Sequence, residues 1–150
     1  YAPVFLWIGV IFFLSSNSGS MAETSRFVGP ILKYLFPNIS EETLRTIHGL
    51  VRKTAHFTEY AILAFFIVRA LSKSSVAAFR SYRYVLALIV VAGIAGSDEF
   101  NQSFEPSRTA SVWDILLDIT GGFTMIVLLW ILGKLRYDLL GGALQTKLLL

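Results

Sequence analysis

Long apolar runs separated by short polar segments dominate the pattern along this chain. The runs cover residues 2–14, 55–71, 84–96 and 113–133. The first and third are the shortest and fall below the roughly 20 residues that a membrane span requires. Extending the second run back to Arg52 and the third on to Phe104 gives spanning length. We therefore predict an all-α membrane bundle of about four transmembrane helices, as a single domain over residues 1–150, with spans near 2–16, 52–71, 84–104 and 111–133.

The segment between the first two spans carries helical signals of its own. Ser20 with Glu23 three residues later is typical of a capping box, and apolar residues recur at helical spacing over residues 21–36. This pattern predicts a short interfacial helix, interrupted or bent at Gly29-Pro30. A second helix is predicted to begin after Ser40, where two glutamates follow, and to run through Gly49 into the second span.

Composition supports a membrane protein and excludes several other classes. Hydrophobic residues make up 55% of the chain and charged residues 15%, against about 25% charged in soluble domains. The chain has no cysteine, which excludes a disulfide framework, a thiolate metal site and a catalytic cysteine. The net charge of +3 does not indicate nucleic-acid binding, because the basic residues are scattered between apolar runs.

The distribution of charge between the two membrane faces predicts the orientation. With four spans, the loop over residues 69–83 and the tail after residue 133 share one face, which carries seven Lys and Arg against Asp138 alone. The other face carries six Lys and Arg against nine acids. The basic residues of the first face are packed into short segments, which favours the cytoplasm for that face. We therefore expect both termini in the cytoplasm and the polar motifs outside.

Three polar segments are expected to meet at that outer face. They are residues 15–19, residues 52–60, and residues 98–118 around the third connection. Spacings of three or four residues place side chains on common helix faces, and acids facing lipid are energetically costly. These faces are therefore expected to turn inward around a polar cavity. The pairs and triplets that share a face are Arg52 with His56 and Glu59, Asp98 with Gln102, Glu99 with Gln102, and Asp114 with Asp118.

Each of these side chains also has a purely structural interpretation. The structural alternative for His56 and Glu59 is a buried hydrogen-bonded pair that ties the second span to its neighbours. Their spacing also suits metal ligation, and the inward carboxylates suit a divalent cation as cofactor. However, the chain has only two histidines, and His-Glu-x-x-His is absent. The cation therefore remains an alternative here, and the identity of any metal stays open.

The third connection and the fourth span offer further candidates. The structural alternative for Asp114 is an acid in the first helical turn after a Ser111 cap, whereas Asp118 lies too deep for that explanation. Arg108 is either an interfacial anchor or a phosphate ligand at the mouth of the cavity. The serines of residues 15–18 are interpreted as caps of a span end. Small residues at Gly121 and its neighbour Gly122 are expected to let another helix approach closely.

These motifs together resemble the VanZ-like family. The resemblance is carried by Ser-Ser-Asn-Ser-Gly after the first span, Arg-Lys-Thr-Ala-His-Phe-Thr-Glu-Tyr in the second, and Ser-Asp-Glu-Phe-Asn-Gln through Pro-Ser-Arg to Trp-Asp-Ile-Leu-Leu-Asp. It covers roughly residues 14–122. One departure is Ser107, where the family often has glycine. The resemblance implies a small bacterial membrane protein, and the founding member of the family is linked to resistance to the glycopeptide teicoplanin.

From these observations we expect a multi-pass protein of the bacterial plasma membrane whose outer cavity binds, or acts on, an anionic lipid-linked envelope molecule. The alternatives are a non-catalytic module that acts through a protein partner and, less consistent with the small chain, a transporter or channel. Whether it is an enzyme, and its oligomeric state, stay open. The candidate catalytic residues are His56, Glu59, Asp98, Glu99 and Asp118. The candidate substrate-binding residues are Lys53, Tyr60, Gln102, Arg108 and Asp114.

Overall fold

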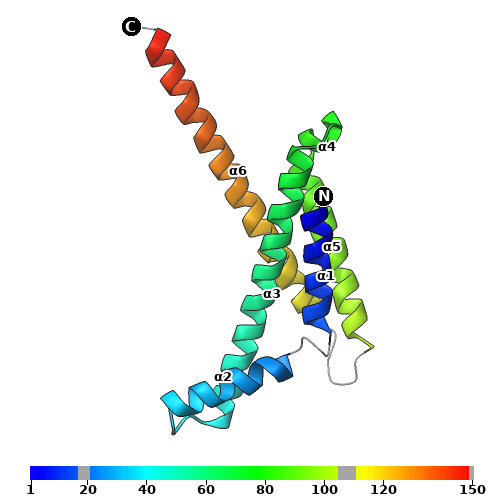
Figure 1. The fold of residues 1–150 in the computed structure, drawn as a ribbon, viewed down its shortest axis with the longest axis vertical. Coiled ribbons are helices and arrows are strands. Elements are labelled where there is room, and N and C mark those ends of the chain that lie inside the picture. Colours follow the sequence, from blue (N-terminus) through cyan, green and yellow to red (C-terminus); the bar gives the residue numbers. More distant parts are fainter. Residues whose placement is uncertain (17–20, 105–110, 149–150) are drawn as a thin grey trace.

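Helices make up nearly all of the structure, a computed structural model that describes residues 1–16, 21–104 and 111–148 (Figure 1). Residues 21–27 and 138–148 are described by their backbone only. In chain order the helices are α1 (Ala2–Ser15), α2 (Met21–Leu35), α3 (Glu41–Ser72), α4 (Ala77–Ser81), α5 (Arg83–Gln102) and α6 (Val112–Leu148).

Three of these helices are long and apolar enough to cross a membrane, namely α3, α5 and α6. At about 1.5 Å per residue, the 20 residues of α5 reach the roughly 30 Å of a hydrocarbon core. The 14 residues of α1 reach only about 21 Å. The prediction of an all-α membrane bundle is confirmed, with three helices of spanning length and a shorter apolar α1 at the position of the first predicted span.

The connection between α2 and α3 begins the second long helix where the sequence predicted. Ser40 is the N-cap of α3, and its hydroxyl accepts a hydrogen bond of 3.1 Å from the backbone N–H of Thr43. The helix then continues through Gly49 without a break. The predicted interruption of α2 at Gly29-Pro30 is wrong, because α2 continues through Pro30. The fixed φ of proline is compatible with a helix, which loses one backbone hydrogen bond there. The predicted capping box at Ser20 lies outside the described residues.

Successive long helices run in alternating directions (Figure 1). The start of α1 and the short helix α4 lie toward one end of the bundle, and α2 extends sideways at the other end, where α3 begins. Helix α3 is central, because it contacts α1, α2, α5 and α6. This arrangement brings the start of α3, the end of α5 and the start of α6 to the same end of the bundle.

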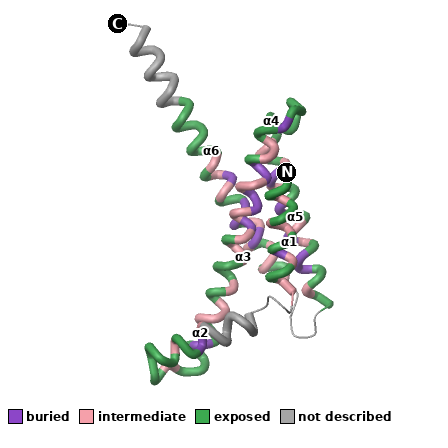
Figure 2. Tube along the Cα trace, viewed as in Figure 1, coloured by how far each residue is buried: buried purple, intermediate pink, exposed green. Residues whose placement is uncertain are grey.

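The core lies between α1, α3, α5 and α6, where the buried residues gather (Figure 2). Large apolar side chains also cover the outside. Ala64, Ala87 and Ala95 are fully buried, so small residues sit where helices pack. Phe5, for example, is 70% exposed. An apolar exterior of this extent is incompatible with water and fits a lipid environment. Other large residues on the outside include Leu6, Val85, Ile89, Trp113, Leu128 and Trp130.

Two adjacent glycines set the distance between α6 and its neighbours. A Cβ atom on Gly121 would lie within 3.0 Å of three backbone atoms of Phe57 in α3. A Cβ atom on Gly122 would lie 2.7 Å from a methyl carbon of Val91 in α5. The prediction that small residues here permit close helix approach is therefore confirmed, and this contact positions the polar groups one turn away.

Candidate functional site

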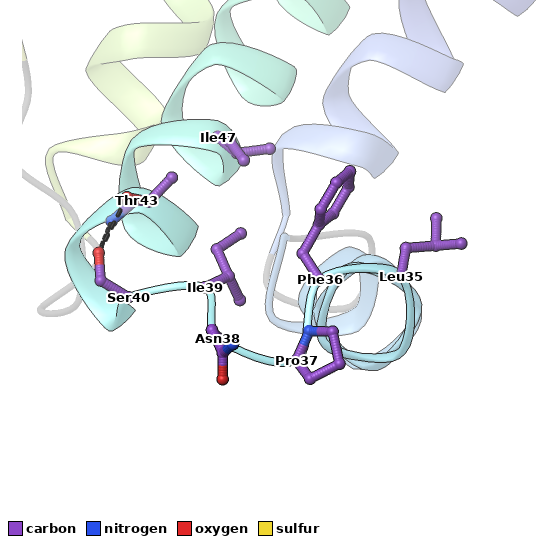
Figure 3. Close-up of a pocket in the computed structure, with 8 residues that line it drawn as sticks. All are labelled: Leu35, Phe36, Pro37, Asn38, Ile39, Ser40, Thr43 and Ile47. Atoms are coloured by element: carbon purple, nitrogen blue, oxygen red, sulfur yellow. Dashed lines mark hydrogen bonds between the residues drawn. The ribbon is translucent and has the colours of Figure 1, made fainter.

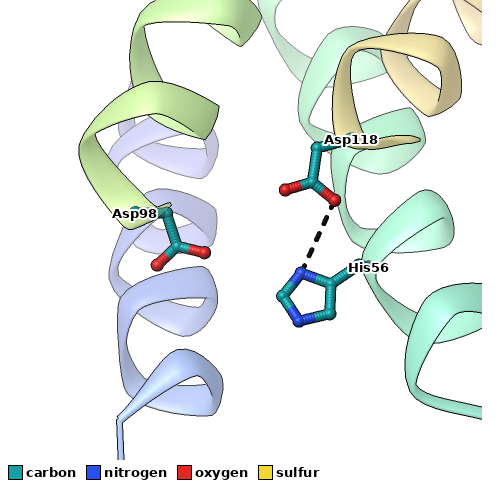
Figure 4. A group of neighbouring side chains, drawn as sticks. All are labelled: His56, Asp98 and Asp118. Atoms are coloured by element: carbon teal, nitrogen blue, oxygen red, sulfur yellow. Dashed lines mark ion pairs between the residues drawn. The ribbon is translucent and has the colours of Figure 1, made fainter. Parts of the chain in front are cut away.

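Three ionisable side chains meet inside the bundle, one from each spanning helix (Figure 4). They are His56 of α3, Asp98 of α5 and Asp118 of α6, and we call them the polar trio. Asp98 is 1% exposed and Asp118 is 2% exposed. Each offers one potential ligand atom, and these three atoms all lie within 4.8 Å of one another. The convergence of candidates predicted on separate helices is thus present in the structure.

Two ion pairs join α3 to α6. Nδ1 of His56 lies 3.5 Å from Oδ1 of Asp118, within ion-pair range but without hydrogen-bond geometry. One turn nearer the end of the bundle, Arg52 lies 3.7 Å from Asp114. Arg52 and His56 are four residues apart on α3, and Asp114 and Asp118 are four residues apart on α6. The two helix faces that the sequence predicted are therefore turned toward each other.

Asp98 is held by hydrogen bonds from two other side chains. The hydroxyl of Ser15 in α1 donates to its Oδ2 at 2.7 Å, and the amide of Gln102 donates to the same oxygen at 3.0 Å. The other oxygen, Oδ1, is buried without a hydrogen-bond partner among the described residues. Asp98 and Gln102 therefore share a face as predicted, while Ser15 takes part in the site rather than only ending a span.

Glu99 has a different environment from the neighbouring Asp98. Its carboxylate accepts a hydrogen bond from the backbone N–H of Ser111, immediately before α6. Adjacent helix positions are separated by about 100° around the axis, so the two acids cannot face the same way. Glu99 is 6% exposed and fixes the start of α6 against the end of α5.

The remaining predicted residues lie around the polar trio or outside the described part. Tyr60 is fully buried four residues after His56, Glu59 is partly buried, and Lys53 is exposed. Arg108 lies outside the described residues, so its prediction rests on the sequence. The sequence interpretation missed Trp7, whose indole N–H donates 2.8 Å to the backbone carbonyl of Glu59. A tryptophan inside an apolar helix is a signal for such a bond, because its N–H needs a partner when buried.

Two described grooves lie away from the polar trio. One, of about 740 Å³, is formed at the corner between α2 and α3 (Figure 3). Its lining residues are Leu35, Phe36, Pro37, Asn38, Ile39, Ser40, Thr43 and Ile47. Another, of about 600 Å³, lies at the opposite end of α3 and is lined in part by Arg69, Arg80 and Arg83. The predicted polar cavity at the trio therefore stays a prediction.

The chemistry available to the trio follows from its residue types. An imidazole beside two carboxylates can accept a proton from a bound hydroxyl or water, can donate hydrogen bonds to an anion, or can ligate a cation. Such groups are rare and costly within membrane helices, which makes each an indication of function. Which of these three roles the trio takes depends on the molecule or ion that it binds.

Comparison with known proteins places the chain in one family. The sequence profile of the VanZ/LLP1 family matches residues 1–133, which covers α1, α3, α5, α6 as far as Gly133 and every residue of the polar trio. No curated protein and no solved structure matched the chain. The match spans most of the sequence and agrees with the motifs around residues 15–19, 52–60 and 98–118. The chain therefore belongs to the VanZ/LLP1 family.

Proposed function

We propose that the polar trio and the residues around it bind an anionic lipid-linked molecule of the cell envelope and act on it. The observation that carries this proposal is the burial of two carboxylates and an imidazole, from three helices, inside a bundle whose exterior suits lipid. A ligand with a lipid tail can reach such a site sideways, with its tail in the bilayer and its polar head between the helices.

The residues divide into those suited to binding and those suited to chemistry. Lys53 is exposed in the first half of α3 and suits a phosphate, as does Arg108 by its place in the sequence. His56 or Glu59 is the general base in this proposal. Asp98, Glu99 and Asp118 orient the reacting groups in this proposal. Tyr60, Gln102 and Asp114 complete the proposed binding surface.

Location and orientation belong to the same proposal. The chain lies in the bacterial plasma membrane with both termini in the cytoplasm and the trio toward the outer leaflet. The density of Lys and Arg in residues 69–83 and after residue 133 supports this orientation. Teicoplanin carries a lipid tail and acts on cell-wall precursors outside the membrane, on the side that this site would face. The proposal therefore includes an effect on glycopeptide sensitivity.

Native mass spectrometry of the gently solubilised protein tests the proposal. The matched variants are Lys53→Gln and Lys73→Gln, two exposed lysines of which Lys53 lies in the first half of α3 and Lys73 directly follows its last residue. We expect an anionic lipid-linked molecule to be retained by the wild type and by Lys73→Gln, and to be lost from Lys53→Gln and from Asp118→Asn. Retention of the same lipids by all four proteins, or by none, contradicts the proposal.

A second candidate function is a non-catalytic membrane module that acts through a protein partner. It is favoured by the bonds that tie α1 to the bundle, from Ser15 to Asp98 and from Trp7 to the backbone of Glu59. In this case the polar trio holds helices together. His56→Ala should then chiefly lower the melting temperature in detergent. A variant with unchanged melting temperature and lost cellular function would favour the ligand site instead.

A further inference from the structure

We propose that His56, Asp98 and Asp118 form a binding site for a single divalent transition-metal ion. The three side chains come from three different helices, and their closest ligand atoms lie within 4.8 Å of one another. Figure 4 shows both carboxylates and the imidazole around one common space. The sequence suggested His56 with Glu59 as a ligand pair, and the structure assigns the ligands differently.

The distances fit an ion after a small adjustment. Tetrahedral zinc with bonds of 2.0–2.2 Å places neighbouring ligand atoms about 3.4 Å apart. Nδ1 of His56 and Oδ1 of Asp118 are already 3.5 Å apart, too far for a good hydrogen bond and right for two ligands of one ion. Because the three ligand atoms lie within 4.8 Å of one another, Asp98 needs to move closer by at most about 1.4 Å to complete the set.

The hydrogen bonds around Asp98 leave one oxygen for the ion. Ser15 and Gln102 both donate to Oδ2, so they fix the orientation of the carboxylate, as residues around metal ligands commonly do. Oδ1 of Asp98, Oδ1 of Asp118 and Nδ1 of His56 are all buried without a hydrogen-bond partner among the described residues. Both aspartates are more than nine-tenths buried, and a buried polar atom without a partner is energetically unfavourable. A bound cation would satisfy these atoms.

Charge and ligand type narrow the choice of ion. Two carboxylates balance a divalent cation, which removes the repulsion between two buried negative charges. One imidazole nitrogen with two carboxylate oxygens suits zinc or manganese. Calcium prefers six to eight oxygen ligands and fits this set poorly. A protonated His56 beside Asp118, with the buried hydroxyl of Tyr60 as the donor to Asp98, is the alternative without metal.

The ion would also give the proposed ligand a point of attachment. Three protein ligands leave at least one coordination position open, and a phosphate oxygen is a suitable fourth ligand. This extension rests on the proposed function, whereas the metal site itself rests only on the trio. The two are distinguishable, because ion binding is measured in protein stripped of lipid.

The experiment measures bound metal directly. The full chain is purified in mild detergent, treated with chelator, delipidated and dialysed against Zn²⁺ or Mn²⁺, and metal per chain is determined by elemental mass spectrometry. We expect one ion per wild-type chain and at least a tenfold weaker affinity in Asp98→Asn and Asp118→Asn. The control is Glu42→Gln, which removes an exposed carboxylate in the first turn of α3, outside the polar trio, and it should bind as the wild type does.

Thermal unfolding of the same proteins controls for misfolding. Added Zn²⁺ or Mn²⁺ should raise the melting temperature of the wild type and of Glu42→Gln, because an ion that binds only the folded state stabilises it. The added ion should leave the melting temperatures of Asp98→Asn and Asp118→Asn unchanged. Both variants are expected to unfold cooperatively without metal, which shows that they are folded. Equal binding by all variants, or no stoichiometric binding by the wild type, overturns the metal site. An absent ion with a retained lipid overturns the metal site alone.

Discussion

Gly121 offers the sharpest test of how α6 is held against α3. In Gly121→Ala the new Cβ would lie 2.9 Å from the carbonyl carbon of Phe57 and closer still to its oxygen. Ordinary contacts of a Cβ atom begin at 3.4 Å. The obstacle is backbone rather than a flexible side chain, so only separation of the two helices by about an ångström relieves the clash.

The expected loss of stability is about 1–3 kcal/mol or more, the usual range for overpacking a well-packed core. The separation should also lengthen the contact between His56 and Asp118, since these residues neighbour Phe57 and Gly121 on the same seam. Gly122→Ala meets Val91 instead, and the double variant with Val91→Ala should recover stability because the obstructing methyl groups are gone.

Thermal unfolding in detergent, followed by size-exclusion chromatography of the heated samples, measures the effect. Gly93→Ala is the matched control, because a Cβ atom there meets nothing within 4 Å. We expect Gly121→Ala to melt well below the wild type, while Gly93→Ala melts close to it. Equal melting temperatures for Gly121→Ala and the wild type would refute the close contact between α3 and α6.

Three further predictions concern the ends of the helices and the orientation of the chain. Ser40→Ala removes the N-cap of α3 and should destabilise the protein by about 0.5–2 kcal/mol, measured by thermal unfolding, with Ser40→Asn restoring it. Trp7→Phe removes the bond to the backbone of Glu59 and should release α1 at a cost of about 0.5–1.5 kcal/mol, visible as faster proteolysis near residue 16. Because the chain has no cysteine, single cysteines report sidedness cleanly. In intact cells a membrane-impermeant maleimide should label Asn38→Cys and spare Ser75→Cys, and the reverse pattern would invert the proposed orientation.

The sequence predicted the bundle because membrane helices are encoded locally. Apolar runs of spanning length and the Ser40 cap need no knowledge of distant residues. Spacing also placed Arg52 with His56 on one face of α3, and Asp114 with Asp118 on one face of α6. What it could not supply was the register between the helices, which pairs Arg52 with Asp114 and His56 with Asp118.

The misses have the same physical origin. Asp98 and Glu99 are adjacent acids with equal claims in the sequence, yet only Asp98 faces the polar trio, because the rotation of the end of α5 is set by packing. Ser15 was interpreted as a cap, but its partner Asp98 lies 83 residues away. A contact of that separation is decided by the fold and leaves no local signal in the sequence.

The lipid composition of bacterial envelopes tests the central claim most directly, namely that the polar trio serves a ligand rather than only the fold. Cells expressing the wild type are compared with cells expressing Glu59→Gln, Asp98→Asn and Asp118→Asn together, at equal abundance and with equal melting temperatures. These substitutions keep the size of each side chain and remove its charge. The account predicts that lipid-linked envelope molecules in the variant cells match those of cells without the protein. A profile identical to that of the wild type, from a folded variant, would contradict it.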